Sequence, residues 1–363
     1  MVNELRWEPR LLVMVTAVLT VFGIASLYAA ATLERNAFGF FSRQLVGAVI
    51  GIVSLVILGR VDYRRWRTLA WPILLITIGL LIIPLLPFTR EISPMRNGAR
   101  RWIQVGPLSF QPSEVARFAV AAWVAMLAAK KGEAIRGFKR GVAPFLVVLV
   151  IVGLLILLEP NLSTAVLVLL IGGVVLFTAG AKIGHFLLIG TAGSVAALSL
   201  IWAEPYRLAR VRCFFESCGQ GNFQLDQALL GFGSGGLLGV GFGEGQLKLH
   251  YLPYAYSDFL FSTIGEEWGF LGVTVLVVLF AIFAWLGFRI ARTAPDPFGR
   301  YLAAGLTAAT SLAAVLHMAV TLGLLPTTGL SFPFMSYGRS GLIVALASVG
   351  VLVSIGRARN SRQ

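Results

Sequence analysis

Asp258 is the residue of this chain best placed to act as a base. It follows a stretch, residues 221–256, that is rich first in glycine and then in tyrosine, and it precedes an apolar run that carries Glu266 and Glu267. A carboxylate at the mouth of an apolar segment can accept a proton from an attacking hydroxyl group. The alternative is structural, because Ser257 or Asp258 could simply cap the helix that follows.

Two groups of arginines could bind an anion. Arg207 and Arg210 are three residues apart, so they share one face if their segment is helical. Guanidinium groups bind phosphate oxygens in a bidentate manner, and this pair therefore suits a diphosphate. The alternative is an amphipathic turn at the membrane interface. Arg100 and Arg101 lie beside Trp102 and could serve the same purpose, or could contact lipid headgroups.

A short polar motif, Gln111-Pro112-Ser113-Glu114, opens one of the apolar runs. A helix start could account for it completely, with Ser113 as the N-cap and Glu114 favourable near the positive end of the helix dipole. A role in binding is the other interpretation.

A second carboxylate, Glu159, ends another apolar run. Pro160 stops that helix, and Asn161 or Ser163 can cap the next one. A tight helical hairpin explains the motif by itself. An acid at the end of a long apolar segment nevertheless needs a partner, and we expect an outer-loop arginine to pair with Glu159.

The segment from Pro326 to Gly338 contains two prolines and two glycines between apolar runs. Irregular backbone at membrane depth is tolerated only where protein or a watery cavity surrounds it. We therefore expect this segment to re-enter the molecule and to line the same cavity.

The composition defines the elements that must position these residues. Of 363 residues, 57% are hydrophobic and 13% are charged, and the mean hydropathy is +0.84. Soluble domains are roughly 25% charged. Many apolar runs reach the ~20 residues that span a bilayer, and they are continuous rather than alternating, which favours helices over a barrel. The predicted fold is one all-α polytopic membrane domain, residues 1–363, with about ten transmembrane helices at 11–33, 43–59, 69–88, 113–130, 142–159, 162–179, 184–203, 258–288, 300–324 and 340–356.

The loop charges predict the orientation of these spans. The first run is too long for a signal peptide and is expected to remain as a helix. Most of the 30 Lys and Arg residues lie on the side of the termini, which places both termini in the cytoplasm and the long loops 89–112 and 204–257 outside. The net charge of +14 is explained by these loops facing anionic lipid, so nucleic acid is not an expected partner.

Other chemistries find little support in the sequence. It contains no nucleotide-binding P-loop, zinc-protease or nucleophile-elbow motif, and His185, His250 and His317 lack the spacing of metal ligands. Cys213 and Cys218 could form a disulfide in the outer loop, and the sequence leaves this open.

Taken together, these blocks resemble the SEDS family (shape, elongation, division and sporulation), the group of RodA, FtsW and SpoVE. The resemblance covers nearly the whole chain. It rests on the ten spans and on Asn97-Gly98-Ala99-Arg100-Arg101-Trp102-Ile103, Gln111-Pro112-Ser113-Glu114, Tyr206-Arg207 with Arg210, Gly233-Ser234-Gly235-Gly236-Leu237 through Gly241, Tyr251-Leu252-Pro253, Asp258-Phe259 with Glu266-Glu267, and Pro333-Phe334 with Ser336-Tyr337-Gly338. The segment from Gly241 to Lys248 resembles the division members more than the elongation members.

The resemblance implies a peptidoglycan glycosyltransferase that polymerises lipid II at the outer membrane face beside a class B penicillin-binding protein. Lipid II, the growing glycan strand, that transpeptidase and membrane lipid are thus the expected partners. The essential aspartate of the family falls on Asp258. Substrate contacts are expected at Arg101, Gln111, Ser113, Glu114, Glu159, Arg207, Arg210, Lys248, Ser336 and Tyr337.

This chain departs from the family pattern in three places. The usual Pro-Glu-x-His-Thr-Asp is Pro253-Tyr254-Ala255-Tyr256-Ser257-Asp258, so Asp258 lacks an adjacent titrating group. The usual Gln-Pro-Asp is Glu159-Pro160-Asn161. The usual Tyr-Gly-Gly is Tyr337-Gly338-Arg339, which adds an outer cation.

The implied reaction is a single inverting displacement, since lipid II is an α-linked sugar diphosphate and the polymer is β-1,4-linked. It needs one base and a stabilised leaving group, for which Arg101, Arg207, Arg210 or a divalent cation such as Mg²⁺ or Mn²⁺ could serve. A retaining mechanism would need a second carboxylate ~5 Å away, and Glu266 and Glu267 lie at least two turns into their helix. The competing hypotheses are a lipid II flippase, which would place charges along a path through both leaflets, and a non-catalytic scaffold for the transpeptidase.

Small residues predict where the transpeptidase's membrane anchor binds. Gly269-Phe270-Leu271-Gly272 in the eighth span and Ala303-Ala304-Gly305 in the ninth would allow a partner helix to approach closely.

Overall fold

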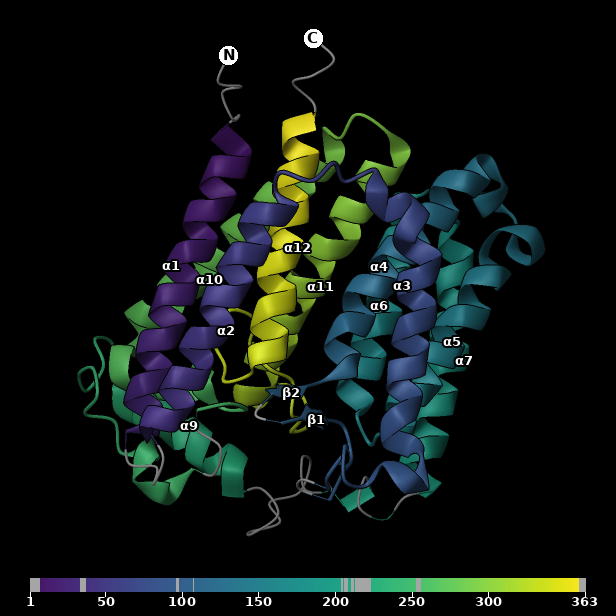
Figure 1. The fold of residues 1–363 in the computed structure, drawn as a ribbon. Coiled ribbons are helices and arrows are strands. Elements are labelled where there is room, and N and C mark those ends of the chain that lie inside the picture. The colour runs from purple at the N-terminus through teal and green to yellow at the C-terminus, as the bar shows by residue number, and fades with distance from the viewer. Residues whose placement is uncertain are drawn as a thin grey trace.

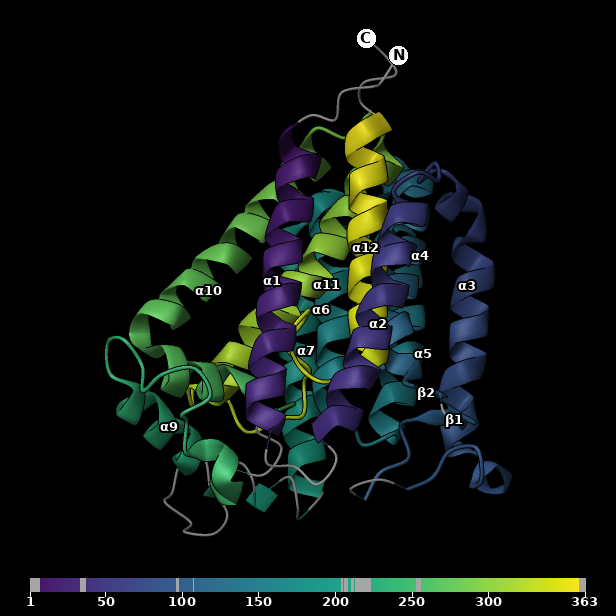
Figure 2. The ribbon, with the colours of Figure 1, turned by 60° about the vertical axis from the view of Figure 1, so that its left-hand side comes forward.

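The computed structural model describes residues 7–32, 37–95, 98–106, 108–203, 205, 208–209, 212, 223–252 and 256–358. Within them, each predicted span coincides with a helix. These helices are α1 (Trp7–Ala31), α2 (Ala37–Leu58), α3 (Arg65–Ile82), α4 (Pro112–Lys131), α5 (Ala143–Leu158), α6 (Leu162–Thr178), α7 (Ile183–Ala203), α10 (Leu260–Arg292), α11 (Pro297–Thr321) and α12 (Arg339–Ala358). The start of α1 and the end of α12 lie at the same end of the bundle, here called the terminal end (Figures 1 and 2). The opposite end is called the hairpin end.

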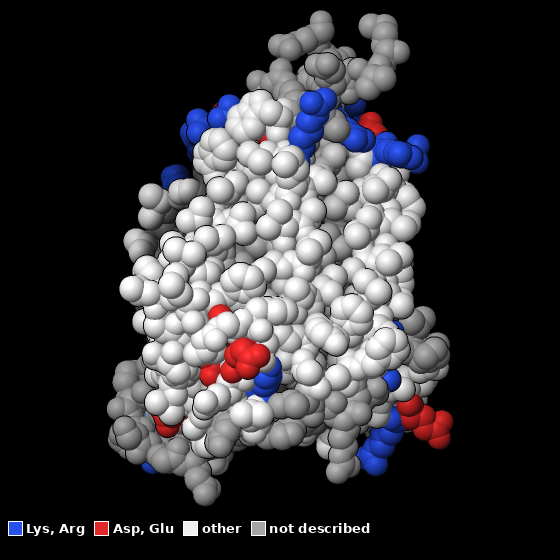
Figure 3. Space-filling model, turned by 90° about the vertical axis from the view of Figure 1, so that its left-hand side faces the viewer, with Lys and Arg blue, Asp and Glu red and all other residues white. Residues whose placement is uncertain are grey.

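Length and apolar composition identify a polytopic membrane protein. Eight of the helices are long and apolar enough to cross a membrane, while α6 and the apolar part of α7, Ile183–Val195, are shorter. Figure 3 shows a broad uncharged belt between two charged ends. Exposed side chains such as Ile50, Ile76 and Val147 lie on α2, α3 and α5 and suit contact with lipid.

Helices α4 and α11 form the centre of the bundle, and both are rich in alanine. Lipid provides little hydrophobic drive for helix association, so small residues that let backbones approach closely stabilise the contact. A Cβ added to Gly305 of α11 would lie 3.0 Å from the Cβ of Ala121 in α4. Ala303 and Ala304 are almost completely buried. The prediction that Ala303-Ala304-Gly305 faces a partner helix is therefore wrong, because these residues pack inside the protein.

Helix α10 leans away from α1 toward the hairpin end (Figure 2), and the two are joined at the terminal end by an ion pair between Arg289 and Glu8, 3.1 Å apart. The helix is broken at Gly269, whose φ of 62° and ψ of −165° are not helical. A helix break at membrane depth frees backbone groups that must find partners within the protein.

The glycine-rich segment after α9 (Phe223–Gly235) supplies these partners. The carbonyls of Glu266 and Glu267 accept hydrogen bonds from the N–H groups of Val240 and Gly241, at 3.0 and 3.2 Å. Beyond the break, the Phe270 N–H donates to the Gly236 carbonyl at 2.9 Å, and the Leu271 N–H donates to the Leu237 carbonyl at 3.1 Å.

The close approach of the two backbones explains two of the glycines. A Cβ on Gly269 would lie 2.3 Å from the Gly239 nitrogen, and a Cβ on Gly239 would lie 2.2 Å from the Glu267 carbonyl oxygen. Both glycines also have positive φ. Gly269 thus packs against the glycine-rich segment inside the protein, and the expectation that it faces a partner helix is wrong as well.

Several short elements were not predicted. Strands β1 (Ile103–Val105) and β2 (Leu108–Phe110) form an antiparallel hairpin with Val105 opposite Leu108, so the fold is not purely α. Alternating apolar residues around Gly106, which has a φ of 58°, are typical of such a hairpin and could have indicated it. The remaining short helices are η1 (Ile83–Leu85), η2 (Pro87–Thr89), η3 (Gly132–Arg136), η4 (Phe138–Val142) and η6 (Leu247–Tyr251).

The segment 326–338 re-enters the bundle, as predicted. Leu330, Phe332, Phe334 and Met335 are each at most 2% exposed. A Cβ added to Gly23 of α1 would lie 2.5 Å from the Met335 Cα, so the segment runs directly against that helix. We call residues 326–338 the re-entrant segment.

Candidate functional site

Asp258 lies in the turn immediately before α10 and is half-buried. The helix begins at Leu260 with Phe259 at the N-cap position and without a side-chain cap. The alternative role of Asp258 or Ser257 as the N-cap residue is therefore wrong. A Cβ added to Gly329, an exposed residue of the re-entrant segment, would lie 3.6 Å from Asp258 Oδ2, so the carboxylate faces this glycine.

The re-entrant segment holds the turn in place. The hydroxyl of Ser336 donates to the Ser257 carbonyl at 2.6 Å and accepts from the Phe332 N–H at 3.0 Å. The Tyr337 N–H donates to the Tyr256 carbonyl at 3.2 Å. The structure thus brings Ser336 and Tyr337 to the turn that contains Asp258, where they bind the backbone carbonyls of the two preceding residues, Ser257 and Tyr256. Their contact with substrate stays a prediction.

Gln44 of α2 fixes the C-terminal end of the re-entrant segment, and sequence reasoning missed it. Its side-chain amide donates to the Ser336 carbonyl at 3.1 Å and its amide oxygen accepts from the Gly338 N–H at 3.1 Å. The side chain is completely buried. The sequence feature that could have indicated Gln44 is its position as a lone amide side chain in the first turns of an apolar run.

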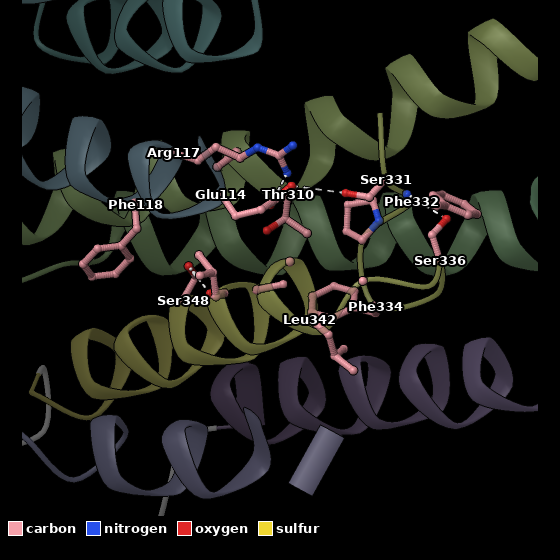
Figure 4. Close-up of a pocket in the computed structure, with 16 residues that line it drawn as sticks. Glu114, Arg117, Phe118, Thr310, Ser331, Phe332, Phe334, Ser336, Leu342 and Ser348 are labelled. Carbon is pink, nitrogen blue, oxygen red and sulfur yellow. Dashed lines mark hydrogen bonds and ion pairs between the residues drawn. The ribbon is translucent and has the colours of Figure 1, made fainter. Parts of the chain in front are cut away.

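Glu114 forms a buried ion pair with Arg117, one turn further along α4 (Figure 4). Glu114 Oε2 lies 2.9 Å from Arg117 Nη1, and Oε1 accepts from the Ser331 hydroxyl at 3.4 Å. The two side chains line a cavity of about 30 Å³ between α4, α11, α12 and the re-entrant segment. A cation three residues after Glu114 in an apolar run was the signal for the pair. Glu114 is therefore engaged within the protein, and its predicted substrate contact stays a prediction.

The start of α4 differs in detail from the prediction. Gln111, not Ser113, occupies the N-cap position, because Pro112 is at the first helical position, which it favours. The Gln111 N–H donates to the Ser340 hydroxyl at 3.2 Å. Ser113 is buried and accepts from the Asn161 amide at 3.5 Å. These contacts join the starts of α4, α6 and α12.

Asn161, one of the two predicted candidates, is the N-cap of α6. Its side chain accepts a hydrogen bond from the Thr164 N–H at 3.4 Å. Arg101 reaches the same turn, where its Nε donates to the Glu159 carbonyl at 2.8 Å and its Nη2 donates to the Pro160 carbonyl. The expected arginine is therefore present, but its hydrogen bonds go to backbone oxygens and not to the Glu159 carboxylate.

Arg100 also forms hydrogen bonds within the protein. Its guanidinium donates at 2.9 Å to the carbonyls of Ser93 and Leu86 and to the hydroxyl of Thr89. Contact of Arg100 with lipid headgroups stays a prediction.

The Glu159 carboxyl group is fully buried, and neither oxygen has a hydrogen-bond partner among the described residues. Burial raises its pKa to about 8, although the positive charge of Arg101 acts in the opposite direction. At neutral pH this side chain is therefore protonated and uncharged, which makes it similar in size and polarity to glutamine.

We expect Glu159→Gln to stabilise the protein at pH 7. An unfolded glutamate loses its proton near pH 4.5, whereas the folded protein keeps it up to about pH 8. Rising pH between these values therefore destabilises the wild type, by up to about 3 kcal/mol at pH 7. Unfolding of the detergent-solubilised protein at pH 5 to 8.5 measures this. The variant should lose the pH dependence, and identical slopes for both proteins would contradict the assignment.

Glu266 and Lys248 fix the glycine-rich segment. The Glu266 carboxylate accepts from the N–H groups of Gln246 and Leu247 at 2.8 and 3.1 Å, and Lys248 Nζ donates to the Gly243 carbonyl. Because both oxygens of Glu266 bind backbone, a role as second catalytic carboxylate is disfavoured. Substrate contact by Lys248 stays a prediction.

Arg207 and Arg210 lie outside the described residues, as do Cys213 and Cys218. Among the residues that are described, no three His, Cys, Asp or Glu side chains cluster in a way that could hold a metal ion.

These features define the class of the protein: a polytopic membrane protein that presents one half-buried carboxylate at the hairpin end, in a turn braced by a re-entrant segment. Residues 6–361 match the family of FtsW, RodA and SpoVE, described as cell cycle proteins. The chain belongs to this family.

Similar proteins cover almost the whole chain. Stage V sporulation protein E of Bacillus subtilis is 36% identical over 356 residues, which is 96% of each protein. A probable peptidoglycan glycosyltransferase FtsW of Geobacter sulfurreducens is also 36% identical, over 98% of this chain and 96% of the relative.

Two solved structures have a similar fold. One chain of a peptidoglycan synthase complex, described as coordinating polymerization and crosslinking, has a TM-score of 0.81 at 28% identity over 96% of this chain and 97% of that one. The crystal structure of the rod shape determining protein RodA of Thermus thermophilus has a TM-score of 0.71 at 29% identity over 96% of both chains.

Proposed function

We propose that this protein is a peptidoglycan glycosyltransferase that polymerises lipid II at the outer face of the cytoplasmic membrane of a bacterium. Membership of the family and the name of the Geobacter relative support the activity. The observation that carries the site is the position of Asp258, half-buried and opposite the exposed Gly329, in a turn where Phe259 rather than Asp258 is the N-cap. Glycan synthesis by Asp258→Asn tests the proposal, as described in the Discussion.

The proposed reaction is one displacement at the anomeric carbon of the donor sugar. The 4-hydroxyl of the acceptor attacks that carbon, its proton passes to the Asp258 carboxylate, and the bond to undecaprenyl diphosphate breaks. The α link of the donor thereby becomes a β-1,4 link. A positioned base of this kind contributes ~10²–10⁴-fold. Arg207 and Arg210 are proposed to stabilise the charge that develops on the diphosphate.

Among the described residues, no three Asp, Glu, His or Cys side chains cluster around a possible metal position. A divalent cation such as Mg²⁺ or Mn²⁺, which one or two carboxylates and the diphosphate could hold, stays a prediction. The roles proposed for this chain's own residues are those of Asp258 and the arginines.

The distribution of buried charge favours an enzyme over a flippase. In the described spans, buried ionisable side chains lie in the turns near the hairpin end, as Glu114, Arg117, Glu266 and Glu267 do, or at the terminal end, as Glu8 does. A transporter is expected to place such groups along a path through both leaflets, near the midplane. The polar groups at the hairpin end suit chemistry on a lipid headgroup.

We propose that the terminal end is cytoplasmic, because most cations lie in its loops. A cysteine introduced near Lys139 should be protected from impermeant thiol reagents in intact cells, and one near Gly221 should react. Replacing Cys213 and Cys218 by serine first removes the native background. The reverse labelling pattern would place the Asp258 site on the cytoplasmic face and contradict the proposed reaction.

A class B penicillin-binding protein is the proposed partner, in keeping with the synthase complex to which the chain is similar. The available surface is the exposed apolar side of α10 beyond its break, which includes Phe270, Leu271 and Val275, each more than half exposed. We expect photo-crosslinkers at Leu271 to capture the partner's membrane helix. Crosslinks confined to α1, α2 and α3 would contradict this placement.

A further inference from the structure

His317 is a buried polar side chain that the proposed reaction leaves unused. It lies one turn before the end of α11 and is 1% exposed. Its Nδ1 is 2.7 Å from the Leu330 carbonyl oxygen. A carbonyl oxygen can only accept, so Nδ1 carries a proton and donates. Nε2 is buried and has no partner within the described part of the chain, which favours the neutral ring, because an unpaired charged N–H would be costly there.

A second contact joins His317 to the re-entrant segment. Its ring stacks on Phe332, with centroids 4.6 Å apart and an interplanar angle of 2°. Phe332 in turn stacks on Phe280 of α10, at 5.0 Å and 25°. The segment is thus held from α11 both by a hydrogen bond to its backbone and by packing on its side chain.

The residues that His317 holds are close in sequence to Gly329, which faces the proposed base. Leu330 directly follows Gly329, whose added Cβ would lie 3.6 Å from Asp258 Oδ2. The next residue, Ser331, meets Glu114. Leu330 belongs to no helix or strand, so its carbonyl has no regular backbone partner and depends on His317.

We propose that His317 is a positioning residue: its Nδ1–H fixes the Leu330 carbonyl, which keeps Gly329 opposite the Asp258 carboxylate and so sets the position of the re-entrant segment beside the proposed base. This inference rests on the proposed function. Catalysis by a positioned base is sensitive to displacements of about 1 Å, which can cost ~10²-fold. His317 therefore acts through the segment that it holds and does not itself touch the substrate.

The hydrogen bond and the stacking can be separated by substitution. His317→Phe keeps an aromatic ring against Phe332 but removes the donor. His317→Asn removes the ring but retains an amide N–H close to the place of Nδ1–H. Thr321→Val is the matched control, because this buried hydroxyl, one turn further along α11, bonds within the described part of the chain only to the carbonyls of His317 and Met318 in its own helix.

The test uses the purified full-length protein with its transpeptidase partner and lipid II. We expect His317→Phe to lower kcat on the order of tenfold or more with KM changed less than about threefold, and His317→Asn to restore most of kcat. Thr321→Val should match the wild type. A wild-type kcat in folded His317→Phe would overturn the proposal. So would losses of kcat that are equal in the Phe and Asn variants and that parallel their losses of thermal stability.

Hydrogen exchange of the backbone amides in residues 329–338 gives a readout that does not depend on activity. His317→Phe should accelerate exchange there and leave α4 and α12 unchanged, whereas unchanged exchange in the segment would overturn the proposal. If wild-type protein made no glycan, the proposed function would fail, and the exchange data would still decide whether His317 holds the segment.

Discussion

Asp258→Asn is expected to lower glycan synthesis by ~10²-fold or more while leaving the thermal stability of the protein almost unchanged. Asparagine keeps the size of the side chain and much of its hydrogen bonding, but it cannot accept the proton of the acceptor hydroxyl. Stability should be preserved because Asp258 is only half-buried and is not the N-cap of α10.

The control for this prediction is Asp226→Asn. Asp226 is an exposed carboxylate in the first turn of α9, at the same end of the molecule. It should tolerate the same chemical change with little loss of activity. Similar losses in both variants would indicate a general effect of removing negative charge at the hairpin end, and would contradict a specific role for Asp258.

Arg117→Met is expected to destabilise the protein by about 3–5 kcal/mol, because it leaves the Glu114 carboxylate buried without its cation. The double variant Glu114→Leu with Arg117→Met should recover most of this loss, since an apolar pair of similar volume removes both charges together. Unfolding of the two single variants and the double variant in the same detergent gives the coupling energy.

Arg292→Met, an exposed cation in the last turn of α10, is the matched control and should change stability by less than about 0.5 kcal/mol. If the double variant were as unstable as the sum of the single variants, the ion pair would not be the cause. Because Ser331 also contacts Glu114, the stable double variant should still have reduced activity.

Hydropathy alone predicted where the apolar helices lie, eight of which are long and apolar enough to cross a membrane, because a bilayer demands long, continuous apolar runs. The re-entry of residues 326–338 followed from the same physics, since prolines and glycines between two spans need protein around them. Asp258 could be selected from its position at the mouth of a span and from the family resemblance.

Contacts between distant residues could not be predicted in this way. Gln44 holds Ser336 from 292 positions away, and no local pattern connects them. Arg101 was expected at the Glu159 carboxylate but binds the backbone carbonyls of that turn, and the sequence does not distinguish these two partners. The break in α10 depends on Gly239, thirty residues earlier in the chain, so a continuous apolar run concealed it.

Glycan synthesis from lipid II by the purified protein, reconstituted in liposomes with its transpeptidase partner, is the most direct measurement of the proposed activity. We expect wild type to form β-1,4 glycan polymers and to release undecaprenyl diphosphate, and Asp258→Asn to form at least ~10²-fold less. Equal synthesis by the two proteins would remove Asp258 from the reaction. Absence of glycan with wild type, together with protein-dependent movement of lipid II across the bilayer, would contradict the glycosyltransferase and identify a flippase.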